Sequence, residues 1–575
     1  MRRDEQDWDI VTCAGWHPDD RSGRLIPGFL AALIAALWIP DAHAQTASQI
    51  TPPSFEPSLQ GYGGGIVIPQ GAGPDAPPGA DKLSVRIKAV RIEGGLPALT
   101  EKEHEISATI SGRTVTAAAL FAAARELEQA YAAAGYGLVR VLLPAQRLID
   151  GATLRLVVID GFIEHIDTSR LPSNIRGWTA AVLAPLQDQR GLTMREIERK
   201  VLLAGDTPGT VLRSTLERGS KPGASILIVE ARFKPVTGFI STDNTLANAL
   251  GRYSTNLGVD SNSPTGHGEL LYFRAGGLPW ADGDAGFFNA DPRNRYVAGG
   301  LTLPLGFDGL TFNFEATDAR TTPIPSSNGL GITSDFTRYS ARLRYPVFRS
   351  RNLTLNAETR FDAQDDQASV INPLALGLSL DRLRIYRASG DVIWFSPQGG
   401  VVAARLMQSF GIDGLGARDA PPAGSTDVPL SQQGAKPGFQ KLEAQIGYNQ
   451  PLLDHLALDL RARGQTSFNQ SLMRSEQIGL SAATGLSTFD AGSLQGDSGY
   501  VVRTEAQFPF AAPFILPFNV PDFPGQQGFV ASYDGLAPAA FMLTPYIFGA
   551  FGSVYLEDPT VLEHAVVSGS SYGVG

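Results

Sequence analysis

The sequence predicts a mainly β protein, in which two small α+β units precede an antiparallel β-barrel that crosses a membrane. Three observations predict this fold. An N-terminal leader marks the chain for export. Two consecutive stretches then repeat one order of strands and helices. From Pro235 onward, segments of about ten residues alternate apolar and polar side chains, as strands do when one face meets lipid and the other meets water.

The composition excludes several classes of function. The 575 residues carry a net charge of -10, which argues against nucleic acid as a partner because phosphate binding needs a basic surface. The single cysteine, Cys13, cannot form an intrachain disulfide, and the 7 histidines are not at metal-ligand spacing. We therefore expect no metal and no cofactor.

Residues 1–44 are predicted to be an N-terminal extension and a signal peptide. Arg21 and Arg24 supply positive charge, Leu25–Ile39 is an apolar run, and Ala42–Ala44 is a small-residue cleavage site. The run is short for a membrane helix, although an uncleaved anchor is the alternative. Residues 45–82 are rich in proline and glycine, which predicts a flexible linker or a plug-like segment.

The first α+β unit is expected at residues 83–160 and the second at residues 161–234. In the first, strands are predicted at 83–94, 137–144 and 152–161, around a helix that places Leu120, Leu127 and Tyr131 on one face. The second unit repeats the plan, with strands at both ends and two helices between them.

The barrel is predicted for residues 235–575, with about fourteen strand-like segments. Phe312 and Phe314 alternate with Asn313 and Glu315, and the other segments behave alike. The strands of a soluble β-sandwich also alternate apolar and polar side chains. Three features favour the barrel: the polar faces are charged, aromatic residues edge the apolar faces, and a leader precedes the whole. Because lipid offers no hydrogen bonds, the sheet of such a barrel must close.

Several sequence strings resemble one family, the outer-membrane transporters of two-partner secretion of the haemolysin-activator and filamentous-haemagglutinin-transporter type. The strings that carry the resemblance are Leu127–Tyr131, Arg140-Val141, Val158–Glu164, Ile197–Arg199, Leu202–Gly209, Asp243-Asn244 and Gly496–Arg503. The resemblance implies two polypeptide-transport-associated (POTRA) domains in the periplasm and a barrel of 16 strands in the family form.

The implied function is the secretion and activation of one large β-rich partner, a haemagglutinin- or haemolysin-like exoprotein. The protein would not be an enzyme. It would act as a monomer in outer-membrane lipid, after insertion by the barrel-assembly machinery, and its POTRA domains would bind the unfolded client. The residues expected to contact the client are Glu128, Tyr131, Arg140, Glu198, Arg199 and Asp206.

The resemblance also implies a loop that folds into the barrel lumen. The family holds this loop with a V-R-G-[YF] motif and with the aspartate of an F-x-D-x-G motif, but here Ser487 replaces the arginine and Ala550 replaces the aspartate. Losing both members of a charged pair can be nearly neutral, whereas losing one is costly. The motif positions are Leu486, Ser487, Thr488, Phe489, Asp497, Gly499, Arg503, Phe548, Ala550 and Gly552.

Two further functions stay open at this stage. The sequence ends where the family would begin its last two strands, so a passive pore or an inactive, truncated paralogue is the alternative to a translocator. A distant third is a hydrolase, because Gly569–Gly573 matches G-x-S-x-G around Ser571. No histidine follows Ser571, so the match is expected to be a coincidence.

Overall fold

The computed structural model describes residues 45–57, 66–67, 76–279, 285–325, 331–372, 376–481, 484–489, 491–514, 539–561 and 563–575. The predicted leader, residues 1–44, lies outside the described residues. Within them, no helix is long and apolar enough to cross a membrane.

The first α+β unit contains one helix more than the sequence predicted. Its elements are β2 (Ser84–Glu93), η2 (Pro97–Leu99), α3 (Thr100–Ile110), β3 (Thr114–Thr116), α4 (Ala117–Ala133), β4 (Arg140–Leu142) and β5 (Ala152–Ile159). The prediction missed α3 because its sequence, TEKEHEISATI, is polar and buries only Ile106 and Ile110. The predicted apolar face of α4 is confirmed, since Leu120, Leu127 and Tyr131 are all buried.

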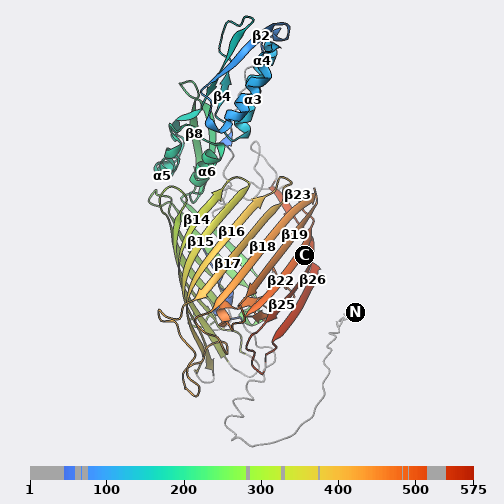
Figure 1. Ribbon diagram of the computed structural model, residues 1–575. Coiled ribbons are helices and arrows are strands. Elements are labelled where there is room, and N and C mark those ends of the chain that lie inside the picture. Colours follow the sequence, from blue (N-terminus) through green and yellow to red (C-terminus); the bar gives the residue numbers. More distant parts are fainter. Residues whose placement is uncertain are drawn as a thin grey trace, which may run out of the picture. The chain divides into compact units, whose positions relative to one another are not determined.

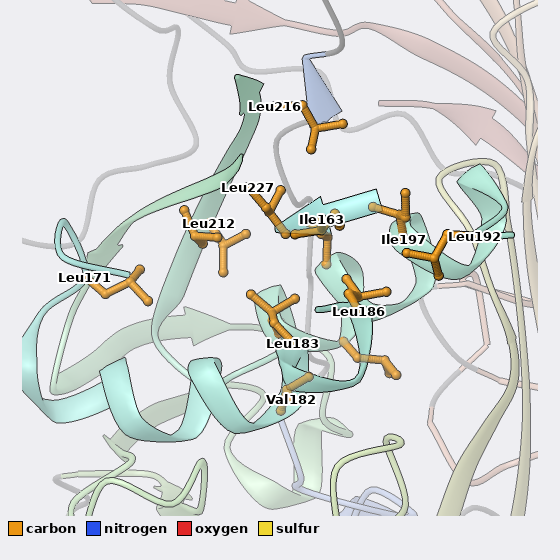
Figure 2. Packing of buried hydrophobic residues seen from close by; sticks show 14 of the residues in the cluster. Ile163, Leu171, Val182, Leu183, Leu186, Leu192, Ile197, Leu212, Leu216 and Leu227 are labelled. Atoms are coloured by element: carbon orange, nitrogen blue, oxygen red, sulfur yellow. The ribbon is translucent and has the colours of Figure 1, made fainter. Parts of the chain in front are cut away.

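The second unit follows the predicted order. It consists of β6 (Phe162–Asp167), α5 (Ser173–Leu183), η3 (Ala184–Leu186), α6 (Met194–Gly205), β7 (Thr210–Arg218) and β8 (Ala224–Phe233). Leucine, isoleucine and valine side chains from both helices and from the sheet form one core, and Ile163, Leu183, Ile197 and Leu227 lie at its centre (Figure 2). Thr193 caps α6, and its hydroxyl accepts a hydrogen bond from the Glu196 N–H group.

A short strand, β1 (Ile66–Val67), adds to the sheet of the second unit. It runs parallel to β7 and pairs with Ser214 and Thr215, so the sheet order is β1-β7-β8-β6. The segment that precedes both units therefore uses the edge of β7 as a template for strand pairing.

The remaining strands form one antiparallel sheet of 14 strands with a barrel-like fold, which confirms the predicted fold class (Figure 1). They are β9 (Val236–Asp243), β10 (Ser254–Asn262), β11 (Leu270–Gly277), β12 (Asn294–Pro304), β13 (Thr311–Thr321), β14 (Gly331–Arg349), β15 (Leu353–Asn372), β16 (Leu376–Phe395), β17 (Val401–Gly411), β18 (Gln440–Leu453), β19 (Leu456–Thr466), β22 (Ser498–Gln507), β25 (Tyr546–Tyr555) and β26 (Val566–Val574). Each strand pairs with its neighbours in chain order, from β9 to β26.

The strand connections lie at two ends of the barrel. We call the end that contacts the second α+β unit the near end, and the opposite end the far end. The near end carries the connections after β10, β12 and β14, including residues 305–310 and 350–352. The far end carries the connections after β9, β11 and β13. The connection between β22 and β25 contains a hairpin, β23 (Phe510–Phe514) and β24 (Ala539–Leu543). The connection between β19 and β22, residues 467–497, contains η5 (Arg474–Glu476), β20 (Ile478–Gly479) and β21 (Gln495–Gly496).

The alternation predicted for the strands is confirmed. On β13, Phe314 is 45% exposed, whereas Asn313 and Glu315 on either side of it are buried. On β22, Tyr500 and Val502 point outward, and Arg503 is buried on the inner face. The inner face of the barrel is therefore polar and charged, and the outer face is apolar.

Candidate functional site: the lumen of the barrel

Residues 45–57 lie inside the barrel and contact its inner wall from the far end toward the near end. At the far end, the Gln45 side chain accepts a hydrogen bond from the Ala247 N–H group at 2.9 Å, and its carbonyl oxygen accepts one from Thr321 at 3.3 Å. Toward the near end, Glu56 accepts a hydrogen bond from Thr302 on β12 at 2.9 Å. Within residues 45–57 there is one helix, α2 (Ala47–Ile50), which is a single turn. We call residues 45–57 the resident segment.

Arginines of the wall hold the resident segment by backbone and side-chain oxygen atoms. Arg338 on β14 donates to the carbonyl oxygen of Pro52 at 2.9 Å, and Arg360 on β15 donates to that of Pro53 at 3.0 Å. Arg342 donates to the Ser54 hydroxyl and forms an ion pair with Glu56 at 3.2 Å. All three arginines are at most 6% exposed, so these contacts are screened little by water.

Glu315 on β13 organises the arginines and the resident segment together. Its carboxylate, fully buried, accepts hydrogen bonds from the Phe55 N–H group at 2.9 Å and from the Tyr272 hydroxyl at 2.8 Å. It also pairs with Arg338 at 3.2 Å and with Arg342 at 3.4 Å. A buried carboxylate needs such partners, because removing one charge from water costs several kcal/mol.

The connection between β19 and β22, which we call the inward loop (residues 467–497), is fixed to the wall by one of its own acids. Glu476 makes a bidentate contact with Arg387 on β16, at 2.9 Å and 2.6 Å, and an ion pair with Lys441 on β18 at 2.9 Å. Arg387 also pairs with Asp362 at 2.7 Å. Glu476 is 2% exposed, so the loop inserts a charge between two buried cations.

Asp497 fixes the end of the inward loop. Its carboxylate accepts hydrogen bonds from the N–H groups of Leu472 at 2.8 Å and Glu557 at 2.9 Å, and from the Gln477 side chain at 3.1 Å. It thus joins the loop to the connection between β25 and β26.

The motif positions meet in one cluster on β22, β25 and the inward loop. Arg503 on β22 donates to the carbonyl oxygen of Gly485 at 3.2 Å and to the Ser487 hydroxyl at 3.1 Å. Its guanidinium lies over the Phe548 ring, 3.7 Å from the centroid. Ala550 lies directly across from Arg503 in the strand register. A strand arginine therefore reaches the loop here, where the family pattern has a loop arginine reaching a strand aspartate.

Apolar contacts complete this cluster. Leu486 is fully buried and packs with Ile478, Leu480 and Ala550. Thr488 pairs with the Ser571 hydroxyl at 2.6 Å, and a Cβ atom on Gly569 would lie 2.9 Å from the Phe489 ring. Gly499 and Gly552 allow close approach of backbones, since a Cβ atom on either would come within 2.7 Å of a carbonyl oxygen on the neighbouring strand.

The comparisons with known proteins identify the family of this chain. Residues 223–520, more than half of the chain, match the model of the haemolysin secretion/activation protein family ShlB/FhaC/HecB, and residues 85–161 match the ShlB-type POTRA domain. This chain belongs to that family. Its members are two-partner secretion transporters of the outer membrane, as the resemblance in the sequence implied.

Two relatives are similar to this chain in sequence, and one solved structure is similar to it in fold. The outer membrane transporter CdiB-2 of Burkholderia pseudomallei is 30% identical over 148 residues, which cover 25% of this chain and 24% of CdiB-2. The heme/hemopexin transporter protein HuxB of Haemophilus influenzae is 22% identical over 425 residues, which cover 71% of this chain and 69% of HuxB. The structure of CdiB from Escherichia coli aligns with a TM-score of 0.62 at 18% identity, over 88% of this chain and 86% of that one.

In this family member, three of the predicted client contacts lie within the first POTRA domain. Tyr131 is fully buried, and its hydroxyl donates to Glu103 and accepts from the Leu96 N–H group at 2.9 Å. Burial, reinforced by the Glu103 carboxylate, raises the pKa of Tyr131 far above its usual value, so the hydroxyl stays protonated. Glu128 accepts from the Val141 N–H group at 3.0 Å and lies 3.8 Å from Arg140, which joins α4 to the edge strand β4.

The other three predicted contacts lie on α6 or at its end and touch the near end of the barrel. Asp206 makes a bidentate contact with Arg349, at 3.0 Å and 2.7 Å. Arg199 donates to the carbonyl oxygen of Pro346 at 2.9 Å, and Glu198 accepts from the Arg351 N–H group at 2.7 Å. The structure thus brings these three residues together as a contact between the second POTRA domain and the barrel.

A cavity of about 790 Å³ lies beside this contact. Its lining combines POTRA residues such as Trp178 and Asp206 with lumen residues such as Arg342 and Glu358, and Pro53 of the resident segment borders it. The cavity therefore joins the second POTRA domain to the lumen. In the described part of the chain, no group of three histidine, cysteine, aspartate or glutamate side chains is placed to hold a metal ion.

Sequence reasoning missed Glu476, Arg387, Arg338 and Arg360 as site residues. The alternation does place the three arginines on the inner face, so their exposure to the lumen was readable. Glu476 carries no such signal, because it lies in a connection whose path depends on contacts with β16 and β18.

Proposed function

We propose that this protein secretes one large β-rich exoprotein through the lumen of its barrel, which lies in the bacterial outer membrane with both POTRA domains in the periplasm. One observation carries the proposal. The lumen already holds a polypeptide segment without helix or strand, residues 51–57, against a wall of buried arginines and carboxylates. A lumen that can hold one such segment offers the contacts that a second chain needs in transit.

The client would first bind the POTRA domains by strand addition. The edge of β7 supports this step, because β1 already pairs there with Ser214 and Thr215. Backbone hydrogen bonds to a sheet edge provide affinity without strict sequence demands. For Glu198, Arg199 and Asp206 to meet a client, α6 first has to release the barrel.

The domain boundaries that we propose are 45–82 for the linker and plug-like segment, 83–160 and 161–234 for the POTRA domains, and 235–575 for the barrel. The proposal includes a haemagglutinin- or haemolysin-like client, assistance from the barrel-assembly machinery and a monomeric state. It contains no chemical step on the client, so Ser571→Ala should leave secretion unchanged. Folding of the client outside the cell would supply the driving force.

The test compares secretion with conductance. Deletion of residues 83–234 should abolish secretion of the partner exoprotein, while single-channel recordings in planar bilayers still show an open pore. The full-length chain is the control for both measurements. If the deletion variant secretes as well as the full-length chain, or if the full-length chain secretes nothing, the translocator proposal fails and a passive pore is left.

A further inference from the structure

The two POTRA domains use the same edge of their sheets in different ways. The strands β4 and β7 correspond to each other, because each follows the second α-helix of its domain and pairs antiparallel with the strand that comes next. The outer side of β7 pairs with β1, whereas β4 is the last strand of its sheet in the described part of the chain. The free N–H and C=O groups of such an edge strand are a template for pairing with another chain.

We propose that Glu128, Arg140 and Gln146 cap the β4–β5 edge of the first POTRA domain and thereby keep it from pairing with another chain. Without these three side chains, which we call the edge caps, the edge would pair with the same edge of a second copy of this chain. The inference goes beyond the proposed function. Under that function, the edge caps leave strand addition of the client to β7.

Glu128 and Arg140 cover the outer side of β4. The Glu128 carboxylate accepts a hydrogen bond from the Val141 N–H group at 3.0 Å, so this group does not bond to β5. Residues of antiparallel strands alternately bond to the neighbour and turn away from it, so Val139 turns away together with Val141. The Arg140 guanidinium donates to the Val139 carbonyl oxygen at 2.9 Å, and the Val139 N–H group donates to the Tyr136 carbonyl oxygen at 3.1 Å. These outward groups are therefore already bonded within the domain.

Gln146 covers the part of β5 that β4 does not reach. The last residue of β4, Leu142, lies opposite Val157. If the strand continued in this register, Pro144 would lie opposite Arg155, but a proline has no N–H group to complete that pair. Instead, the Gln146 side chain donates to the Arg155 carbonyl oxygen at 2.8 Å and accepts from the Arg155 N–H group at 2.9 Å. One side-chain amide thus replaces the peptide groups of a missing strand residue.

The second POTRA domain uses the corresponding residues differently. Its outer strand β7 spans Thr210–Arg218 without a proline, so it can pair along its length. Glu198 has the place on α6 that Glu128 has on α4, directly after an apolar residue of the domain core. Glu198 turns to the barrel, where it accepts from the Arg351 N–H group at 2.7 Å. The outer side of β7 is therefore left to a strand, and β1 pairs there.

A second copy of the chain is the partner that an uncapped edge would meet. Two identical edges can pair antiparallel about a twofold axis, because each edge then offers its donors to the acceptors of the other. Copies in one membrane also share an orientation and hold their POTRA domains at the same height, which raises their effective concentration. Natural sheets block such edges with charged side chains and proline, and the β4 edge has both.

The first experiment removes the edge caps from the full-length chain in detergent. The variant Glu128→Ala/Arg140→Ala/Gln146→Ala should have twice the protein mass of the unchanged chain, measured by light scattering after size-exclusion chromatography. Thermal unfolding checks that the variant is folded. A folded variant that keeps the mass of the unchanged chain overturns the proposal.

A matched control replaces the same three residue types at exposed positions of the same domain, with the substitutions Glu126→Ala, Gln129→Ala and Arg147→Ala. This control should keep the mass of the unchanged chain, because its side chains do not cover the β4–β5 edge. A doubled mass in the control would show that any loss of surface polarity causes association, and it would overturn the proposal as well.

A second experiment tests Gln146 alone and leaves the contacts of Glu128 in place. Gln146→Ala should speed hydrogen exchange of the Arg155 N–H group at least tenfold, and it should leave exchange at Val141 unchanged. Adding Pro144→Thr should restore slow exchange at Arg155, because threonine supplies the missing N–H group and lets β4 continue. Unchanged exchange in Gln146→Ala, or no recovery with Pro144→Thr, contradicts the capping role.

These measurements separate the inference from the proposed function. Protein mass and hydrogen exchange are measured on the purified chain and require no secretion. If the edge remains monomeric and protected without its caps while the unchanged chain secretes its exoprotein, only this inference fails. If the unchanged chain does not secrete, the proposed function fails, and the two experiments still decide whether the edge is capped.

Discussion

Two pieces of chain lie in the same lumen and are held by different sets of contacts. The wall contacts the resident segment through backbone groups of Pro52, Pro53 and Phe55 as well as through the Glu56 carboxylate, whereas the inward loop is fixed by the carboxylate of Glu476 between Arg387 and Lys441. Backbone contacts can be exchanged for those of another chain, but a buried ion pair selects one side chain. The difference suggests that the inward loop stays in the lumen and that the resident segment can dissociate from it.

The largest effect is expected at the ion pairs of the loop. Glu476→Gln leaves Arg387 and Lys441 without their shared partner and should lower the stability of the barrel by about 3–5 kcal/mol. Thermal unfolding in detergent and protease cleavage between residues 467 and 497 measure the loss. Glu563→Gln, at an acid whose carboxylate accepts a local hydrogen bond from the Thr560 N–H group, is the control. An unchanged unfolding temperature would show that the loop is held by other contacts.

The next effect concerns the segment. Phe55→Ala empties the pocket beside Tyr272 and should weaken docking of the segment by about 3 kcal/mol without changing barrel stability. Single-channel conductance should rise because the lumen is open for a larger fraction of the time, and Phe55→Leu should behave almost as the unchanged protein. If Phe55→Ala destabilises the barrel as much as Glu476→Gln does, the resident segment contributes as much to barrel stability as the inward loop. The proposed difference between the two is then wrong.

The third prediction concerns the ion pair between Asp206 and Arg349, and it tests whether this pair holds the second POTRA domain against the barrel. Asp206→Asn removes the charge that Arg349 binds at 2.7 Å and should cost about 2 kcal/mol of docking between α6 and the barrel. Carbodiimide crosslinking of the Lys200 amine to the Asp308 carboxylate, which form an ion pair at 3.2 Å, should then be slower than in the unchanged background. Asp188→Asn, in the same POTRA domain, should not change the rate.

The smallest effect is expected at the altered family motif. Ala550→Asp places a carboxylate across from Arg503 in the register and should be tolerated to within about 1 kcal/mol. Ser487→Arg alone should be worse, because it brings a second guanidinium to Arg503, and the two substitutions together should recover part of that loss. A double-mutant cycle on thermal unfolding measures the coupling. No coupling would mean that the Arg503 contact to Ser487 does not hold the loop.

The sequence predicted the side chains on the inner face of the barrel better than the segments that lie inside the lumen. Because strand side chains alternate with a period of two, Glu315, Arg342 and Arg503 could be assigned to the inner face from local pattern alone. The polar helix α3 was missed because only Ile106 and Ile110 mark its buried side. The position of Glu476 could not be derived, since it depends on cations 89 and 35 residues away along the chain.

The predicted client contacts show a second limit. Helical periodicity had already placed Tyr131 beside Leu120 and Leu127, and its burial follows from that periodicity. No local pattern indicated the contact of Asp206, because its partner Arg349 belongs to another domain. Contacts between domains join side chains that lie far apart along the chain. The periodicity of a short stretch of sequence therefore does not predict them.

The prolines of the resident segment have a kinetic consequence. A strand in a sheet leaves by breaking a cooperative ladder, whereas this segment is tied by separate bonds from separate side chains. It can therefore detach in small steps, each with a low barrier, while an incoming chain occupies the vacated positions one after another. Such gradual replacement would keep the passage filled while a protein crosses it.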